Sequence, residues 1–303
     1  MPVELQKLLE KQQYRFSGEH SAVKICEWTK RSLRDEGFCY KQKFYGIKSH
    51  LCCQVSPAVN FCPHQCTFCW RPQEYNLGFD PVGFDDPEKI IENSIKAQRK
   101  LLSGFGGNEK TNKKKFKQAQ HPNMFAISLS GEPSLYLKLG ELIKNLDKRE
   151  ITSFVVSNGI YPEYLSKIIG NNEPTQLYIT LPAPDKETYM KICKPMIVGG
   201  WERINKTLNL LSEFNCRKVI RLTLVKGINM VKPGEYAKIL DNLDIDYIEA
   251  KGYVWVGFSR KRLKEENMPK HTEIKEFSKK IEKNSKYKIL DEKKESRVVL
   301  LGN

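Results

Sequence analysis

Short apolar runs of the kind that form buried strands alternate along most of the chain with segments of helical period. The strand-like runs are AVNF at 58–61, MFAISLS at 124–130, FVVS at 154–157, QLYITL at 176–181, VIRLTLV at 219–225 and YIEAK at 247–251. The helical patterns that follow them lie at 87–102, 133–146, 161–169, 186–192, 234–243 and 274–284. Strands and helices in this order predict right-handed β–α–β units around a parallel sheet. We therefore predict the α/β class, with a partial (β/α)6 TIM-like barrel rather than an open sheet.

The first 57 residues follow a different pattern. Helical periods are visible at 3–14 and 22–35, and the segment CYKQKFYGIKSHLCCQ at 39–54 has no clear period. We predict a Cys-rich N-terminal extension over 1–57 and a barrel with basic loops and C-terminal elements over 58–303. Within the barrel, GFGGNEKTNKKKFKQAQ at 104–120 mixes glycines with lysines, which is typical of a mobile basic loop.

Composition narrows the class of protein. The chain has 303 residues, 40% of them hydrophobic, and a formal net charge of +15. Such a basic balance fits a polyanionic partner such as nucleic acid, although a generally lysine-rich proteome explains it as well. No run of about 18 apolar residues occurs and the first residues are charged, so we expect a cytoplasmic protein with no membrane partner. Because the cytosol keeps thiols reduced, nine cysteines indicate metal-binding or catalytic roles rather than disulfides. Cys193 and Cys216 are predicted to be core or incidental residues.

Three cysteines follow the first predicted strand in the C-x3-C-x2-C run NFCPHQCTFCW, at Cys62, Cys66 and Cys69. Three thiolates this close in sequence can hold three irons of one [4Fe-4S] cluster, and the missing fourth cysteine leaves one iron open to another ligand. A zinc site with a contribution from His64 is an alternative, although zinc normally takes four protein ligands. Plain structural cysteines are a further alternative.

The triplet, with Phe68 directly before its third cysteine, resembles the signature of the radical S-adenosylmethionine (SAM) enzymes. The resemblance extends over roughly residues 58–255 and implies the partial barrel. It also implies that the open iron binds SAM and that reductive cleavage of SAM yields a 5'-deoxyadenosyl radical, which abstracts hydrogen from an unactivated carbon.

Two further elements match the pattern of that family. The residues they assign to SAM are Gly131, Glu132, Pro133, Ser157 and Asn158. The first three resemble the family's GGEP element, with Ser130 in place of its first glycine, and a carboxylate there would receive the SAM amino group in a charge-assisted hydrogen bond. The last two end the next predicted strand, where relatives contact the ribose or carboxylate of SAM, although turn chemistry explains an Asn-Gly pair equally well.

A second set of cysteines, Cys26, Cys39 and Cys52, lies before the predicted barrel with 12 residues between neighbours. Three such thiolates can converge in a folded extension; Cys53 is a competing ligand and buried structural cysteines are the alternative. The blocks CYKQKFYGIKSHLCCQ and FCPHQCTFCWRP closely resemble the tRNA wyosine synthases, specifically the archaeal family that makes 4-demethylwyosine. This resemblance covers essentially the whole chain and implies a second [4Fe-4S] cluster on these three cysteines.

The same resemblance implies a radical SAM lyase that forms 4-demethylwyosine in wyosine and wybutosine biosynthesis. Its substrates are phenylalanine tRNA bearing N1-methylguanosine-37, and pyruvate, which supplies two carbons and loses its carboxyl carbon. Eukaryotic relatives carry a flavodoxin-like domain that this sequence lacks, so we expect an external electron donor of flavodoxin or ferredoxin type. We expect a monomer.

Two lysines of the extension are candidates for covalent work on pyruvate. Lys41 is predicted to form an imine, because a lysine near a metal cluster and other cations can be held as the neutral nucleophile. Lys43 is its rival, and a solvent-exposed or tRNA-binding role is open for either lysine. The open iron of the second cluster could instead chelate pyruvate, and both roles can coexist.

Basic and aromatic residues occur together in the segments 24–50 and 251–270, each with a net charge of +4. Basic groups bind phosphates, and aromatic rings stack on unpaired bases. The predicted RNA-binding residues are Trp70, Tyr253, Trp255, Arg260, Lys261 and Arg262. Core packing is the alternative for the aromatic rings.

Two other function classes stay open. One is a different radical SAM enzyme, which methylates RNA or activates a protein partner. The other is a non-enzymatic iron–sulfur or zinc protein that binds nucleic acid. SAM turnover distinguishes the second class from any radical SAM enzyme.

Overall fold

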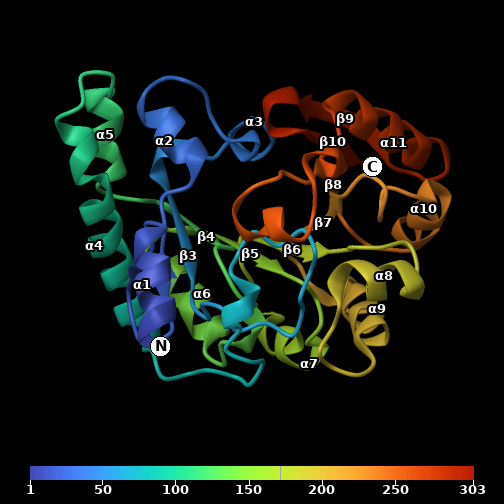
Figure 1. The fold of residues 1–303 in the computed structure, drawn as a ribbon, viewed down its shortest axis with the longest axis horizontal. Coiled ribbons are helices and arrows are strands. Elements are labelled where there is room, and N and C mark those ends of the chain that lie inside the picture. The colour runs from blue at the N-terminus through green and yellow to red at the C-terminus, as the bar shows by residue number, and fades with distance from the viewer. Residues whose placement is uncertain (171) are drawn as a thin grey trace. The chain divides into compact units, whose positions relative to one another are not determined.

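The structure is a computed structural model that describes residues 1–170 and 172–303, and its contacts divide the chain into two units (Figure 1). Unit 1 consists of Met1–Phe61, Phe79–Val156 and Gly170–Thr175. Unit 2 consists of Cys62–Gly78, Ser157–Ile169 and Gln176–Asn303. Among the helices described, none combines the length and apolar character needed to cross a membrane.

Unit 1 carries five strands that pair in chain order. They are β1 (Arg15–Phe16), β2 (Ala22–Val23), β3 (Cys52–Ser56), β4 (Met124–Ile127) and β5 (Thr152–Ser157). β2 pairs antiparallel with both β1 and β3, whereas β3, β4 and β5 pair in parallel. All four residues of β4 are buried, as expected for a strand covered on both faces.

Helices of unit 1 accompany these strands. They are α1 (Val3–Lys11), α2 (Glu27–Leu33), α3 (Tyr40–Tyr45), α4 (Pro87–Gly106), α5 (Lys113–Ala119) and α6 (Leu139–Asp147), with 3-10 turns η1 (Ser49–Leu51) and η3 (Pro133–Leu135). The predicted helix at 87–102 is confirmed as α4. It begins where the Asp86 carboxylate accepts a hydrogen bond from the Lys89 amide and Pro87 occupies the first turn.

The first parallel strand lies earlier in the chain than predicted. The expected strand at 58–61 is wrong, because β3 ends at Ser56 and Asn60 adopts a left-handed conformation with φ 63°. The expected helix at 22–35 is likewise shorter, since Ala22–Val23 pairs as β2 and α2 starts only at Glu27. Cys52 is therefore the first residue of a parallel strand and not part of a separate extension.

The basic segment at 104–120 is not a mobile loop. Asn112 caps α5 by accepting the Lys115 amide, and Lys115 forms an ion pair with Asp35 at 2.5 Å. On the inner face, Phe116 packs on a buried cluster that includes Leu33 and Leu102. The prediction of a loop rested on the glycines and lysines of the segment and took no account of Phe116, whose packing holds the helix in place.

Unit 2 also carries five strands, paired in the order β6-β7-β8-β10-β9. They are β6 (Gln176–Thr180), β7 (Arg217–Leu224), β8 (Tyr247–Gly252), β9 (Lys288–Lys293) and β10 (Val298–Gly302). The strands β6, β7 and β8 are parallel, and β10 runs antiparallel to both of its neighbours. Each unit thus contributes three parallel strands to the six that the sequence predicts, and the predicted α/β class is confirmed.

The helices of unit 2 follow its strands as in other α/β proteins. They are α7 (Pro162–Leu165), α8 (Lys186–Cys193), α9 (Gly200–Leu210), α10 (Pro233–Asp241) and α11 (His271–Lys283). The 3-10 turns are η2 (Gln73–Tyr75), η4 (Ser166–Ile168), η5 (Leu211–Glu213), η6 (Gly257–Lys261), η7 (Glu265–Asn267) and η8 (Lys294–Ser296). Sequence patterns missed α9, β9 and β10.

Candidate metal centres

The loop that carries Cys62, Cys66 and Cys69 is anchored within unit 2 by backbone hydrogen bonds. Gln65 donates its amide to Cys193 O at 2.9 Å, and Thr67 donates to Ile192 O at 2.8 Å. These acceptors are the last carbonyls of α8, which have no partner within the helix itself. A helix end therefore orders the loop between its first and last cysteines.

Arg71, two residues after the last motif cysteine, is buried with 5% of its surface exposed. Its Nε donates to Cys69 Sγ at 3.2 Å and its Nη2 donates to His64 O at 3.1 Å, while Nη1 has no hydrogen-bond partner among the described residues. Burial opposes the charge of this guanidinium, but the thiolates of Cys62 and Cys69 outweigh burial and raise the pKa of Arg71. A buried cation with an unsatisfied donor suits a site that receives a negatively charged group.

The other two motif thiols also have side-chain neighbours. Asn158 Nδ2 donates to Cys62 Sγ at 3.7 Å, and its Oδ1 accepts the Ile160 amide. A hydrogen bond with Cys193, followed by burial, raises the pKa of the Cys66 thiol well above its usual value. Cys193 is buried as predicted, but it is not incidental. Nothing beyond its position after a helical pattern could have linked it to the motif.

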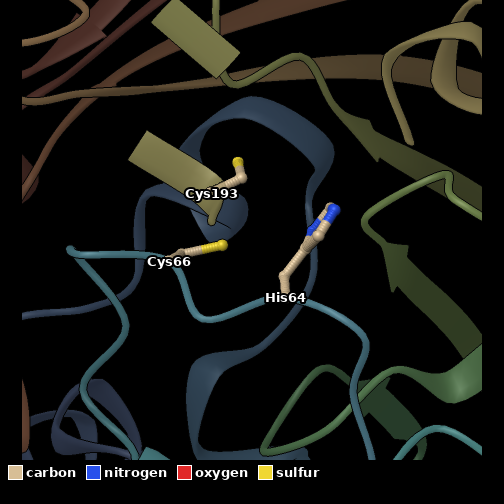
Figure 2. A group of neighbouring side chains, drawn as sticks. All are labelled: His64, Cys66 and Cys193. Carbon is tan, nitrogen blue, oxygen red and sulfur yellow. The ribbon is translucent and has the colours of Figure 1, made fainter. Parts of the chain in front are cut away.

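His64 is the histidine that the zinc alternative invokes. The structure brings its ring nitrogen together with the sulfurs of Cys66 and Cys193, all within 4.8 Å of one another (Figure 2). The imidazole hydrogen-bonds the Tyr189 hydroxyl at 2.7 Å, and burial lowers the pKa of His64 to about 3. His64 is therefore a buried, hydrogen-bonded partner of Tyr189.

The residues predicted to bind SAM have close local contacts. Gly131 has φ +75°, and a Cβ there would lie 1.8 Å from Ala58 O, so the position requires glycine. Glu132 is buried, and its Oε1 accepts hydrogen bonds from the amide and hydroxyl of Ser134. Pro133 opens η3 and is buried, as is Ser157, whose Oγ accepts the Gly159 amide at 3.0 Å.

The second cysteine set converges within unit 1, with each thiol at the start of an element. Cys26 caps α2, Cys39 precedes α3 and Cys52 begins β3. The pKa of Cys52 is raised well above its usual value by burial and then by the charges of Cys26 and Cys39, whereas Lys41 opposes the rise. Neighbouring Cys53, unlike the partly exposed Cys52, is fully buried, and burial raises the pKa of its thiol, as for a core cysteine.

A hydrogen-bond network around Ser49 connects the segments that carry these cysteines. Thr29 Oγ1 lies 3.2 Å from Cys26 Sγ and donates to Ser49 O at 3.0 Å. Ser49 Oγ accepts the Cys39 amide at 2.9 Å and donates to Gln42 Oε1 at 2.9 Å. Sequence reasoning missed this network, because polar residues in a segment without a clear period show no pairing pattern.

The two candidate lysines differ in their surroundings. Lys41 is 8% exposed, and its Nζ lies 4.8 Å from the centre of the Phe154 ring. Lys43 lies further along α3 and is exposed. Only the buried lysine contributes to the electrostatics of Cys52.

The aromatic residues predicted to stack on RNA are held in different ways. Tyr253 is 2% exposed and its hydroxyl hydrogen-bonds Ser259, so this side chain packs in the interior of unit 2. Trp255 is half-buried and donates its Nε1 to Leu263 O at 2.8 Å. Trp70 is half-buried, and its carbonyl accepts the amide of Phe258.

The three basic residues predicted to bind RNA differ in their exposure and contacts. Arg260 and Lys261 are exposed and lie over the rings of Trp255 and Phe258 at 4.4 and 4.6 Å. Arg262 instead donates to the carbonyls of Thr67 and Cys69 in the cysteine loop. A basic surface suited to phosphates therefore remains at Arg260 and Lys261.

Two family models match the chain. The radical SAM superfamily model matches residues 56–240, and a model described as wyosine base formation matches residues 244–303. Together they span unit 2 almost completely and much of unit 1.

Similar proteins are named S-adenosyl-L-methionine-dependent tRNA 4-demethylwyosine synthase. The one from Pyrococcus abyssi is 51% identical over 99% of this chain and 89% of its own length. The one from Methanocaldococcus jannaschii is 42% identical over all of this chain and 97% of its own length. The Arabidopsis thaliana relative is 37% identical over 97% of this chain, which spans 45% of that longer protein.

Solved structures agree with these matches. A structure described as TYW1 with a lysine–pyruvate adduct bound has a TM-score of 0.90 and 39% identity, and the match covers all of this chain and 96% of the other. A crystal structure of archaeal TYW1 has a TM-score of 0.82 at 36% identity, with the same coverage of both chains.

Proposed function

Because the chain belongs to the tRNA 4-demethylwyosine synthases of the radical SAM superfamily, we propose that it condenses N1-methylguanosine-37 of phenylalanine tRNA with pyruvate to form 4-demethylwyosine. It is a radical SAM enzyme with a lyase-type reaction in wyosine and wybutosine biosynthesis. The observation that carries the proposal is a whole-chain match at 51% identity to a relative of that name. The three thiols of each set and a buried lysine support it.

We assign SAM and its [4Fe-4S] cluster to Cys62, Cys66 and Cys69. When bound, they supply the 5'-deoxyadenosyl radical that removes hydrogen from the N1-methyl group of the guanosine. The donor set fits a cluster, because three thiols adjoin the buried guanidinium of Arg71, which no carboxylate neutralises among the described residues. The SAM-binding residues proposed are Gly131, Glu132, Pro133, Ser157 and Asn158.

We assign a second [4Fe-4S] cluster to Cys26, Cys39 and Cys52. The charges of Cys26 and Cys39 both act on Cys52 more strongly than that of Cys53, although Cys53 is its neighbour in the chain, which supports this set over one that includes Cys53. Thr29 and the Ser49 network would keep Cys26 and Cys39 in position as ligands. Three protein ligands leave one coordination position, which pyruvate can occupy.

Lys41 is the residue we propose for the imine with pyruvate. Its Nζ attacks the C2 carbonyl carbon, the C=N bond forms and water leaves. The amine must be neutral to attack, and the structure holds Lys41 away from bulk water, 8% exposed with its Nζ 4.8 Å from the centre of the Phe154 ring. Exposed Lys43 lacks this environment, and the relative solved with a lysine–pyruvate adduct supports a lysine in this role.

The tRNA partner accounts for the basic charge of the chain. Arg260 and Lys261 would bind phosphates near the anticodon loop, and Trp255 offers a half-buried ring for a displaced base. We propose a monomer that works in the cytoplasm, where tRNA is modified, and that receives electrons from a flavodoxin or ferredoxin.

The test is anaerobic incubation of cluster-reconstituted protein with SAM, a reductant, 13C-labelled pyruvate and tRNA bearing N1-methylguanosine-37. Mass spectrometry of the digested nucleosides should detect a tricyclic base that carries label from C2 and C3 of pyruvate. Transcript with unmodified guanosine-37 is the matched control and should yield none. Formation of 5'-deoxyadenosine with an unchanged base would keep the radical chemistry and contradict the substrate. Absence of both products with clusters filled would favour a binding protein.

A further inference from the structure

Arg71 is a buried cation without a carboxylate. It is 5% exposed, and none of the ion pairs among the described residues includes it. A buried charge is strongly disfavoured unless an opposite charge compensates it. The negative groups that face Arg71 are the sulfurs of Cys62, Cys66 and Cys69, once these are thiolates.

Each of these three sulfurs has a different hydrogen-bonding neighbour. Cys62 accepts from the Asn158 amide at 3.7 Å, Cys66 is paired with the Cys193 thiol, and Cys69 accepts from Arg71 Nε at 3.2 Å. The amide of Asn158 and the thiol of Cys193 are neutral, so Arg71 is the charged group among these three neighbours of the sulfurs. Its hydrogen bond is also shorter than the one from the Asn158 amide.

The guanidinium is fixed in orientation as well as in place. Nη2 donates to His64 O at 3.1 Å while Nε donates to Cys69 Sγ, so one planar group bridges two points of the motif loop, His64 and Cys69. Arg262 also contacts this loop, but it donates to the carbonyls of Thr67 and Cys69 and lies 3.9 Å from the exposed Glu74 carboxylate. Arg262 therefore braces the loop, whereas Arg71 acts on sulfur.

We propose, on the basis of the cluster assigned above, that Arg71 is the positioning residue that sets the reduction potential of the cluster held by Cys62, Cys66 and Cys69. Reduction adds one negative charge to the cluster. A fixed positive charge bonded to a ligand sulfur stabilises the reduced form more than the oxidised form, and water does not screen it because the site is buried. Arg71 thereby raises the potential, which makes reduction by a protein donor easier.

The experiment is an EPR-monitored redox titration of the reconstituted protein. The signal to follow is the one that changes when SAM is added, which separates this cluster from a second one. The variants are Arg71→Gln, which removes the charge, Arg71→Lys, which keeps it, and Arg149→Gln as a matched control at an exposed arginine paired with Glu88. Circular dichroism and iron content are measured for each.

At the wild-type midpoint potential, Arg71→Gln should lower the ratio of reduced to oxidised cluster at least tenfold, which is about 59 mV for a one-electron couple. Arg71→Lys should stay within about threefold of wild type, and Arg149→Gln should not differ from it. An unchanged ratio in Arg71→Gln would overturn the proposal, as would an equal fall in Arg71→Lys. If Arg71→Gln folds but holds no iron, the potential of Arg71→Lys decides: a ratio within about threefold of wild type supports the proposal, and a tenfold fall overturns it. Wild-type protein without any SAM-sensitive signal would instead contradict the function proposed above.

Discussion

The two cysteine sets of this protein differ in the basic residue that each keeps buried beside it. In unit 2 the residue is Arg71, which is always charged and donates to Cys69 Sγ. In unit 1 it is Lys41, which lies over the Phe154 ring and acts electrostatically on Cys52. An arginine cannot become a nucleophile at neutral pH, whereas a buried lysine can lose its proton.

The two sets of three thiols are similar, but the basic residue beside each set suits a different reaction. Three thiols with a permanent cation suit a cluster whose task is to accept an electron. Three thiols with a lysine suit a site that binds a keto acid and forms a covalent bond to it. In the function proposed above, the basic residue beside each set, rather than the number of cysteines, distinguishes the task proposed for each unit.

The largest effect is expected from a ligand of the unit 2 set. Cys69→Ala removes both a proposed cluster ligand and the acceptor of the Arg71 hydrogen bond. Formation of 5'-deoxyadenosine, measured by liquid chromatography, should fall to the level of the protein-free control. Cys216→Ala, at a cysteine outside both sets, should keep wild-type turnover. Substantial turnover in Cys69→Ala would show that the ligand assignment is wrong.

Reductive trapping sharpens the assignment in unit 1. Borohydride added to protein with pyruvate should fix the imine as a stable secondary amine on the peptide that contains Lys41. Lys41→Arg should lower the trapped fraction by about a hundredfold, because the guanidinium does not attack the carbonyl. Lys43→Arg, on the same helix, should trap as wild type. A trapped amine on Lys43 would reverse the two roles.

A smaller effect is expected on tRNA binding. Replacing Arg260 and Lys261 together by alanine should weaken binding about tenfold and reduce the slope of log K against log salt by about 0.7 for each lost phosphate contact. Binding is measured by filter retention across a salt series. The matched control is Lys186→Ala with Lys238→Ala, two exposed lysines elsewhere in unit 2. A slope that does not change would contradict the basic surface.

The smallest effect concerns α8, whose last carbonyls anchor the cysteine loop. Asp185 caps its first turn by accepting the Thr188 amide, and hydrogen bonds from Lys232 and Thr188 lower the pKa of Asp185 to about 2. Asp185→Ala should cost about 1 kcal/mol of unfolding free energy at pH 7. A depressed carboxyl pKa contributes stability above its ordinary value near 3.8 and loses it as the pH falls toward about 2.

Urea unfolding at pH 7, 4 and 2.5 measures this difference. Asp185→Asn should stay close to wild type at pH 7, because asparagine caps a helix as well as aspartate and the lost ion pair is at the surface. The destabilisation of Asp185→Ala relative to wild type should shrink as the pH falls, and a destabilisation that grows instead would contradict this pH dependence.

The sequence predicts the unit 2 set better than the unit 1 set for a physical reason. Cys62, Cys66 and Cys69 share one loop, so their spacing alone constrains them to one site. Cys26, Cys39 and Cys52 meet only because a cap, a second helix start and a strand start come together, and their spacing of 12 residues carries no such constraint. The family resemblance supplied that set, and periodicity could not.

Other features depend on tertiary contacts that no pattern shows. The alternation of apolar runs predicts six parallel strands, yet it misplaced the first of them, because residues 58–60 are buried but follow the strand as a loop. Arg71 stands two residues after the motif, where only its hydrogen bond to Cys69 Sγ reveals a role. Cys193 lies far from Cys66 in sequence and joins it through the end of α8.

The division of tasks between the two units is tested most directly by one reaction of the Lys41→Arg variant, in which both products are quantified from the same sample. With SAM, reductant, pyruvate and N1-methylguanosine-37 tRNA, the account predicts that 5'-deoxyadenosine still forms at a rate near that of the wild type. The tricyclic nucleoside should fall by about a hundredfold. Loss of both products together, or wild-type amounts of the tricyclic base, would contradict the account.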